Sequence, residues 1–196
     1  MKTKASFSLL VLSLLCTCFA FSQSFEKLKS ETKKIYDGNY TMDFETVANL
    51  TYPKIYEEKG RTTFIDKLDR DYQNDEYRMR LELETAIFIY SEMKKAAGKS
   101  FCIITYKNPT RFFFESKLDA TAAAEKAKVL KENTQSNEVT FEPKRNSFNV
   151  RRNSQFIAVS DESTNLEWKF FNMDDPFQRK AFETIFTADV KKELGL

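Results

Sequence analysis

The sequence predicts an α+β fold, with N-terminal helices packed on a curved antiparallel sheet and a C-terminal helix after the sheet. Apolar residues recur at helical spacing in residues 25–72. From Tyr77 onward the apolar residues alternate with polar ones, which indicates strands. A helical pattern returns after Asp175. Helices and strands that are segregated along the chain in this way are typical of the α+β class.

Three helices are expected before the first strand. Their apolar positions are Phe25, Leu28, Thr32 and Ile35, then Phe44, Val47, Ala48 and Leu50, then Phe64, Ile65, Leu68 and Tyr72. Gly38 with Asn39 is expected to end the first helix. Asp43 can cap the second helix, which should end near Pro53. The third is expected to be capped by Thr62 or Thr63.

The strands are expected to follow. Residues 77–89 alternate over a long stretch and predict a half-buried strand, and residues 94–98 predict the turn after it. Pro109 is expected to break the next stretch into two strands, because proline lacks the backbone donor. The further strands are predicted at residues 101–106, 111–118, 139–141, 148–151, 156–160 and 168–171.

Two more helices are expected around these strands. Residues 119–133 are rich in alanine and lysine and predict an amphipathic helix inserted between strands. A C-terminal helix should be capped by Asp174 or Asp175, with Pro176 in its first turn. We expect this single helix to bury four apolar residues: Phe182, Ile185, Phe186 and Val190. It would pack Phe182 and Phe186 against Trp168 and Phe170 of the last strand.

Residues 1–22 have the pattern of a secretory signal peptide. Lys2 and Lys4 precede an apolar run at residues 7–15, and Ala20 and Ser22 are the small residues that a signal peptidase reads. Cleavage is expected before Gln23, or in a second acceptable frame after Ala20. The apolar run is too short to span a bilayer, so we expect a periplasmic or extracellular protein without a membrane span, formed by residues 23–196 as one domain.

Either cut removes two of the three cysteines, Cys16 and Cys18. The alternative is a lipoprotein acylated on one of them, but Leu15 is too large for the pattern that such processing needs. Cys102 would then be the one cysteine left, which excludes an internal disulfide. Between Phe101 and Ile103 of a predicted strand, it is expected to be a buried, inert thiol rather than a nucleophile.

The composition excludes several classes of function. Loss of Lys2 and Lys4 brings the formal charge from +2 to zero, and lysine and arginine pairs are scattered, so no nucleic-acid partner is expected. The sequence contains no histidine, which disfavours hydrolytic triads and the usual metal sites, and no cofactor or metal is expected. The acidic cluster Asp69, Asp71, Asp75 and Glu76 lacks the glycine and closing glutamate of an EF-hand loop and is expected to be a solvated helix end.

Two sequence stretches carry a resemblance to a known fold. The first is the run from Asn49 to Tyr56 that leads to Gly60, set between two predicted helices. The second is the closing stretch of residues 157–162 followed by 167–170, a serine and acid turn before a tryptophan-lysine-phenylalanine strand. This order resembles the cone-shaped nuclear transport factor 2-like fold, in its secreted bacterial versions, over residues 25–172. The predicted helix at 119–133 and the C-terminal helix depart from the simplest pattern of that fold.

The resemblance implies an apolar pocket between the N-terminal helices and the sheet. In ketosteroid isomerase-like members, an Asp and a Tyr inside that pocket abstract a proton and stabilise an enolate. The candidates for ligand binding here are Tyr36, Tyr52, Tyr56, Arg111 and Trp168, with Tyr40 and Asp43 as further candidates. Each also has a structural interpretation: Asp43 as a helix cap, Arg111 as the partner of a neighbouring carboxylate, and the aromatic residues as core. No motif identifies a catalytic residue.

The hypothesis that follows is a secreted, non-catalytic binding or interaction module that takes a small apolar ligand or a protein partner. One alternative is a small-molecule isomerase or lyase of ketosteroid isomerase type, which an inward-facing carboxyl group with a raised pKa would favour. The other is a structural protein that forms a homodimer, which an exposed apolar sheet face would favour.

Overall fold

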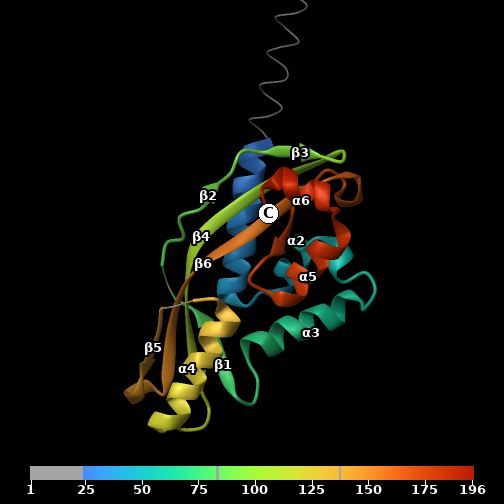
Figure 1. Ribbon diagram of the computed structural model, residues 1–196. Coiled ribbons are helices and arrows are strands. Elements are labelled where there is room, and N and C mark those ends of the chain that lie inside the picture. The colour runs from blue at the N-terminus through green and yellow to red at the C-terminus, as the bar shows by residue number, and fades with distance from the viewer. Residues whose placement is uncertain (1–23, 83, 137) are drawn as a thin grey trace, which may run out of the picture.

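The computed structural model describes residues 24–82, 84–136 and 138–196 (Figure 1). The expected signal peptide, residues 1–22, lies outside the described residues. Within them, helices precede one curved antiparallel sheet and further helices follow it, so the predicted α+β class is confirmed.

The N-terminal part of the fold is helical, as predicted. A long first helix covers residues 24–41 and is followed by α2 (Phe44–Leu50), the short 3₁₀ turn η1 (Pro53–Ile55) and α3 (Arg61–Tyr72). Asp43 caps α2, because its side chain accepts a hydrogen bond from the backbone N–H of Thr46. The predicted threonine cap of α3 is wrong, since its N-cap is Gly60 in the left-handed region at φ 85°.

Gly38 lies inside the first helix rather than at its end, which corrects the predicted boundary. A Cβ atom at Gly38 would lie 3.1 Å from Cγ2 of Val47 and 3.4 Å from the carbonyl oxygen of Asp43. Glycine at this position therefore lets α2 approach the first helix closely, so that what looked like a stop signal is a packing requirement.

The sheet is built on one long pair of strands, β4 (Lys99–Phe114) and β6 (Ser147–Ser160). The strands that pair with β4 are β1 (Tyr77–Leu81), β2 (Ile89–Tyr90) and β3 (Lys94–Ala96). Those that pair with β6 are β5 (Glu138–Glu142) and β7 (Lys169–Asn172). The predicted turn at residues 94–98 is shorter than expected, because β3 joins β4 through Ala97 and Gly98, both at positive φ.

Both long strands are continuous where the sequence predicted interruptions. β4 runs through Pro109, and β6 joins the two strands predicted at residues 148–151 and 156–160. The carbonyl oxygen of Pro109 accepts a hydrogen bond from the backbone N–H of Glu82, so the missing N–H of this residue also faces the β1 side of β4 and not β6. The β4–β6 ladder therefore loses no bond at the proline.

The strand predicted at residues 77–89 is instead divided into β1 and β2. Its two parts pair with β4 at Leu81↔Thr110 and Ile89↔Thr105, and the chain between Leu81 and Ile89 is longer than the stretch of β4 that it passes. Glu82 still donates to the carbonyl oxygen of Pro109, and residues 84–88 form no strand. At Pro109 itself, β4 offers no backbone donor to a neighbouring strand.

The helices α4 and α5 begin close to where they were predicted. The inserted helix α4 (Ala120–Thr134) is capped by Asp119. Asp175 caps α5 (Pro176–Ile185). The single predicted C-terminal helix is wrong, because Phe186 is extended and Thr187 caps a separate helix, α6 (Ala188–Leu194), by accepting a bond from Val190 N–H. Two further 3₁₀ turns are η2 (Pro143–Arg145) and η3 (Glu162–Thr164).

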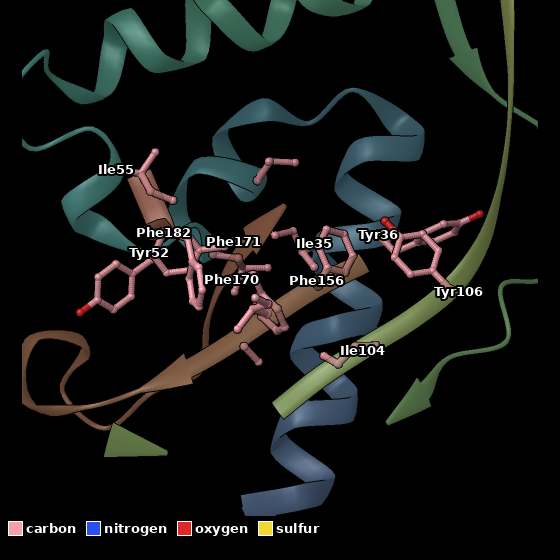
Figure 2. Close-up of a cluster of buried hydrophobic side chains, with 14 of the residues drawn as sticks. Ile35, Tyr36, Tyr52, Ile55, Ile104, Tyr106, Phe156, Phe170, Phe171 and Phe182 are labelled. Carbon is pink, nitrogen blue, oxygen red and sulfur yellow. The ribbon is translucent and has the colours of Figure 1, made fainter. Parts of the chain in front are cut away.

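Helices pack on both faces of the upper part of the sheet. Figure 2 shows Phe170 of β7 beside Phe156 of β6, and Phe171 beside Phe182 of α5. Successive strand residues face opposite sides, so Phe171 rather than Phe170 meets the C-terminal helices, which corrects the predicted cluster. Trp168 is buried, and its indole N–H donates to the carbonyl oxygen of Ser24 in the first helix at 3.1 Å.

Cys102 is buried, as predicted, with 1% of its surface exposed. Burial raises the pKa of its thiol, which donates to the carbonyl oxygen of Ser91 at 3.4 Å. We expect a disulfide reagent to modify the native protein far more slowly than the urea-unfolded protein, because the buried thiol forms little thiolate. Absorbance of the released thiolate measures both rates. Equal rates would show that Cys102 is accessible in the folded protein.

Candidate functional site

A cavity of about 300 Å³ lies on the face of the sheet that the first helix and α4 cover. Residues of the first helix, α3 and α4 line it from one side, and residues of β1, β4 and β6 line it from the other. Asp174 and Asp175, from the segment between β7 and α5, also line it. The volume is at the lower end of the range for small-molecule sites.

Apolar side chains from the sheet and from the helices form one wall of the cavity. Phe112 and Phe114 of β4 and Met79 of β1 face it from the sheet, and Leu68 of α3 and Leu130 of α4 face it from the helices. Met79 and Phe112 are cross-strand partners, so they share one face of the sheet. This wall can hold a hydrocarbon or aromatic body by burial of apolar surface.

Tyrosines form part of one side of the cavity. Tyr36 of the first helix and Tyr106 of β4 meet edge to face with their ring centroids 5.7 Å apart (Figure 2). The hydroxyl of Tyr72 donates to Oδ1 of Asn39 at 3.0 Å. Burial raises the pKa of all three tyrosines, so their hydroxyl groups stay protonated and remain hydrogen-bond donors at neutral pH.

The inner end of the cavity contains an arginine and an amide on facing strands. Arg152 of β6 is the cross-strand partner of Asn108 of β4. One guanidinium nitrogen of Arg152 lies 3.4 Å from the carboxylate of Asp174, which also accepts a hydrogen bond from Ser154 Oγ. Nε of Arg152 and Oδ1 of Asn108 are buried and have no hydrogen-bond partner among the described residues. A buried polar group without a partner costs free energy, so both atoms favour a polar occupant beside them.

The more exposed lining residues of the cavity are charged, and they form ion pairs with one another. Lys67 lies 3.0 Å from Asp175 and 2.5 Å from Asp71, and Lys126 pairs with Glu76. Burial lowers the pKa of Lys67, but the two aspartates outweigh burial and the pKa is raised. Burial also raises the pKa of Asp71 in spite of Lys67, although 47% of the Asp71 side chain is exposed.

The structure separates the five predicted ligand-binding residues. Tyr36 lines the cavity. Tyr52 is fully buried and donates its hydroxyl to Asp161, and Trp168 is in the core against the first helix. Tyr56 packs against Phe64, with ring centroids 5.5 Å apart. Arg111 pairs with Glu82 and Glu142 at 2.9 and 3.3 Å on the opposite face of the sheet.

The two further candidates lie outside the cavity walls. Tyr40 is partly exposed at 37%, and Asp43 is the cap of α2. The acidic cluster at the end of α3 is divided, since Asp71 pairs with Lys67 and Glu76 with Lys126. In the ranges that the structure describes, no group of three or more carboxylate or cysteine side chains is placed to hold a metal ion.

Sequence reasoning missed Asn108, Arg152, Tyr72 and Tyr106. The signal for Asn108 and Arg152 was a polar residue in phase with apolar ones: Arg152 follows Phe148 and Val150 on one face of β6, and Asn108 precedes Phe112 on β4. Both residues fall outside the ranges of the predicted strands, so the alternation did not include them.

No protein-family model matches this chain, and no curated protein matches it in sequence. None of the helices among the described residues is long and apolar enough to cross a bilayer.

Proposed function

We propose that the protein is an exported, non-catalytic binding module that holds a small apolar or amphipathic molecule in the cavity between α3, α4 and the sheet. The observation that carries the proposal is the combination of an apolar wall with a polar inner end in one space of about 300 Å³. Sites that bind small molecules share this combination, because the wall supplies affinity and a few polar groups supply orientation.

The proposal also agrees with the resemblance to the nuclear transport factor 2-like fold. Helices that precede a curved antiparallel sheet, with a cavity between the two, are what that resemblance implies. Export would follow from the signal-peptide pattern of residues 1–22, so the module would meet its ligand outside the cytoplasm.

Binding is tested with phenylnaphthylamine, an uncharged probe that fluoresces in apolar surroundings. We expect saturable binding to the protein. Val129→Trp should weaken binding about ten-fold, because Val129 lines the cavity and a larger side chain there occupies the space of the probe. Val129 is 45% exposed, so the substitution adds little strain to the core. Fluorescence titration measures both affinities.

The matched control is Lys128→Trp on the same helix. Lys128 is exposed and is not part of the cavity wall, and one residue along a helix turns the side chain by about 100°. This variant should bind the probe as the parent protein does. Equal weakening by both tryptophans, or binding that neither of them affects, would show that the probe does not occupy the cavity.

One observation favours the isomerase or lyase alternative: Asp71 lines the cavity and has a raised pKa. An enzyme of this kind would speed deuterium exchange of the α-protons of a bound ketone, and Asp71→Asn would abolish the effect. We favour binding over catalysis, because Asp71 is half-exposed at the mouth and is held by Lys67. Exchange measured by proton NMR separates the two functions.

The dimerisation alternative has weaker support. Ile87 and Ile89 are 77% and 67% exposed near the short strand β2. Two exposed side chains make a smaller apolar surface than a stable homodimer interface requires.

A further inference from the structure

The charged residues that line the cavity cancel one another. Its three cations each have a carboxylate partner: Lys67 with Asp71 and Asp175, Lys126 with Glu76, and Arg152 with Asp174. Among the lining residues that the structure describes, four carboxylates face three cations, so these residues provide no positive charge in excess for an anionic ligand. Beside Asn108, the guanidinium of Arg152 would repel a cationic head group, and the carboxylate of Asp174 would repel an anionic one. An ionic head group would lose its hydration there without gaining an unpaired counter-charge.

Two buried atoms, Nε of Arg152 and Oδ1 of Asn108, lack a partner among the described residues and need opposite kinds of hydrogen-bonding group. Nε of Arg152 carries a hydrogen and needs an acceptor, whereas Oδ1 of Asn108 needs a donor. Asn108 is only 5% exposed, so bulk water does not replace these partners. A single group that both accepts and donates satisfies the pair, and a carboxamide or a hydroxyl does so without a net charge.

A polar hollow adjoins the same two residues. It has a volume of about 320 Å³, and Asn108 and Arg152 line it together with Gln135 and Ser136. Two further cations of the described lining, Lys107 and Arg151, are matched in number by two carboxylates, Glu84 and Glu138. Asn108 and Arg152 thus lie between an apolar cavity and a polar hollow. A ligand with its body against Phe112 and its head group beside Asn108 would match the polarity on both sides.

We infer that the cavity selects uncharged amphipathic molecules whose head group both accepts and donates a hydrogen bond, such as a carboxamide or alcohol on a short apolar body. The inference rests on the proposed binding function. The apolar wall holds the body, Arg152 donates to the head group, and Asn108 accepts from it.

Four probes with nearly the same alkyl chain test the head group: octanamide, heptyl methyl ketone, octanoate and octylamine. Octanamide should bind about five-fold tighter than the ketone, which has the same shape but cannot donate. It should bind about ten-fold tighter than either ion, because neither ion finds an unpaired counter-charge. Isothermal titration calorimetry measures all four dissociation constants.

Two variants locate the preference. Asn108→Leu removes the acceptor and keeps the number and branching of the side-chain heavy atoms, and it should abolish the preference for octanamide over the ketone while leaving affinity for the ketone unchanged. Thr110→Val is the matched control: Thr110 is fully buried two residues along β4, and its Oγ1 has no partner among the described residues, but it does not line the cavity. This control should retain the preference, and circular dichroism checks that both variants are folded.

The outcomes separate this inference from the proposed function. Equal binding of octanamide and the ketone, or retention of the preference in Asn108→Leu, would overturn the head-group inference and leave a general apolar binding site. Ions that bind as tightly as octanamide would overturn selection for an uncharged ligand. No binding of any alkyl probe, together with no binding of phenylnaphthylamine, would overturn the proposed function and the inference with it.

Discussion

Replacement of Phe171 by alanine should lower the free energy of unfolding by about 3–5 kcal/mol. Phe171 is fully buried, and its ring centroid lies 5.0 Å from that of Tyr52, 5.2 Å from Phe182 and 5.7 Å from Phe186. It therefore joins the sheet to both the segment after α2 and the C-terminal helices. Truncation removes contacts to each of them and leaves a cavity that rigid neighbours fill poorly. Urea unfolding, followed by the fluorescence of Trp168, measures the loss.

Phe113→Ala is the matched control for this prediction. Phe113 is a half-buried residue on the opposite, polar face of the lower sheet, where its ring lies 5.9 Å from the guanidinium of Arg111. Its removal should cost about 1 kcal/mol, since a partly exposed ring loses less transfer free energy. A similar loss from both substitutions would contradict the central position of Phe171 in the core.

Replacement of Asp161 by alanine should also destabilise the protein by about 3–5 kcal/mol. Asp161 is 2% exposed and its carboxylate accepts from Lys99 Nζ at 2.6 Å, Tyr52 hydroxyl at 2.8 Å and Ser163 Oγ at 2.6 Å. The substitution leaves the ammonium group of Lys99 and the hydroxyl of Tyr52 without their partner. Thermal and urea unfolding measure the effect. Asp43→Ala, the loss of an exposed helix cap, should cost only about 1 kcal/mol.

The same carboxylate should make stability depend on pH. Burial raises the pKa of Asp161, but the hydrogen bonds from Lys99, Ser163 and Tyr52 outweigh burial and lower it to about 2 from the ordinary value of 3.8. A carboxyl group with a lowered pKa stabilises the folded state at pH values above its pKa in the unfolded state. That stabilisation is lost as the pH falls through about 2. Asp161→Asn should therefore have a lower unfolding temperature than the parent protein at neutral pH. The difference between the two unfolding temperatures should shrink in acid. A constant difference at every pH would refute this linkage.

Local sequence signals were reliable where a residue acts on its own neighbours. Asp43 and Asp175 cap helices where they were expected to, because a cap needs only a side-chain oxygen within three residues of the free N–H groups. The order of helices and strands, and with it the α+β class, followed from the period of apolar residues. The burial of Cys102 followed from the same alternation.

Predictions from local sequence were wrong where the role of a residue depends on a segment that is distant in the sequence. Gly38 could be read as a helix end, because the sequence does not show that α2 packs against it. Pro109 could be read as a strand end, because the sequence does not show on which side of β4 its missing donor lies. Glycine is unfavourable in a helix and proline is unfavourable in a strand. The close approach of α2 at Gly38, and the side of β4 to which Pro109 turns its missing donor, make these residues acceptable here.

The sequence by itself determined the fold class, most helix starts and the aromatic character of the core, since these depend on local hydrogen bonding and on the period of apolar residues. Only the tertiary structure decided which polar residues share a cavity. Asn108 and Arg152 are 44 positions apart, and they meet because Pro109 permits an unbroken β4–β6 ladder whose register pairs them directly. Register is a property of two strands together, so neither strand's sequence specifies alone which side chains face one another.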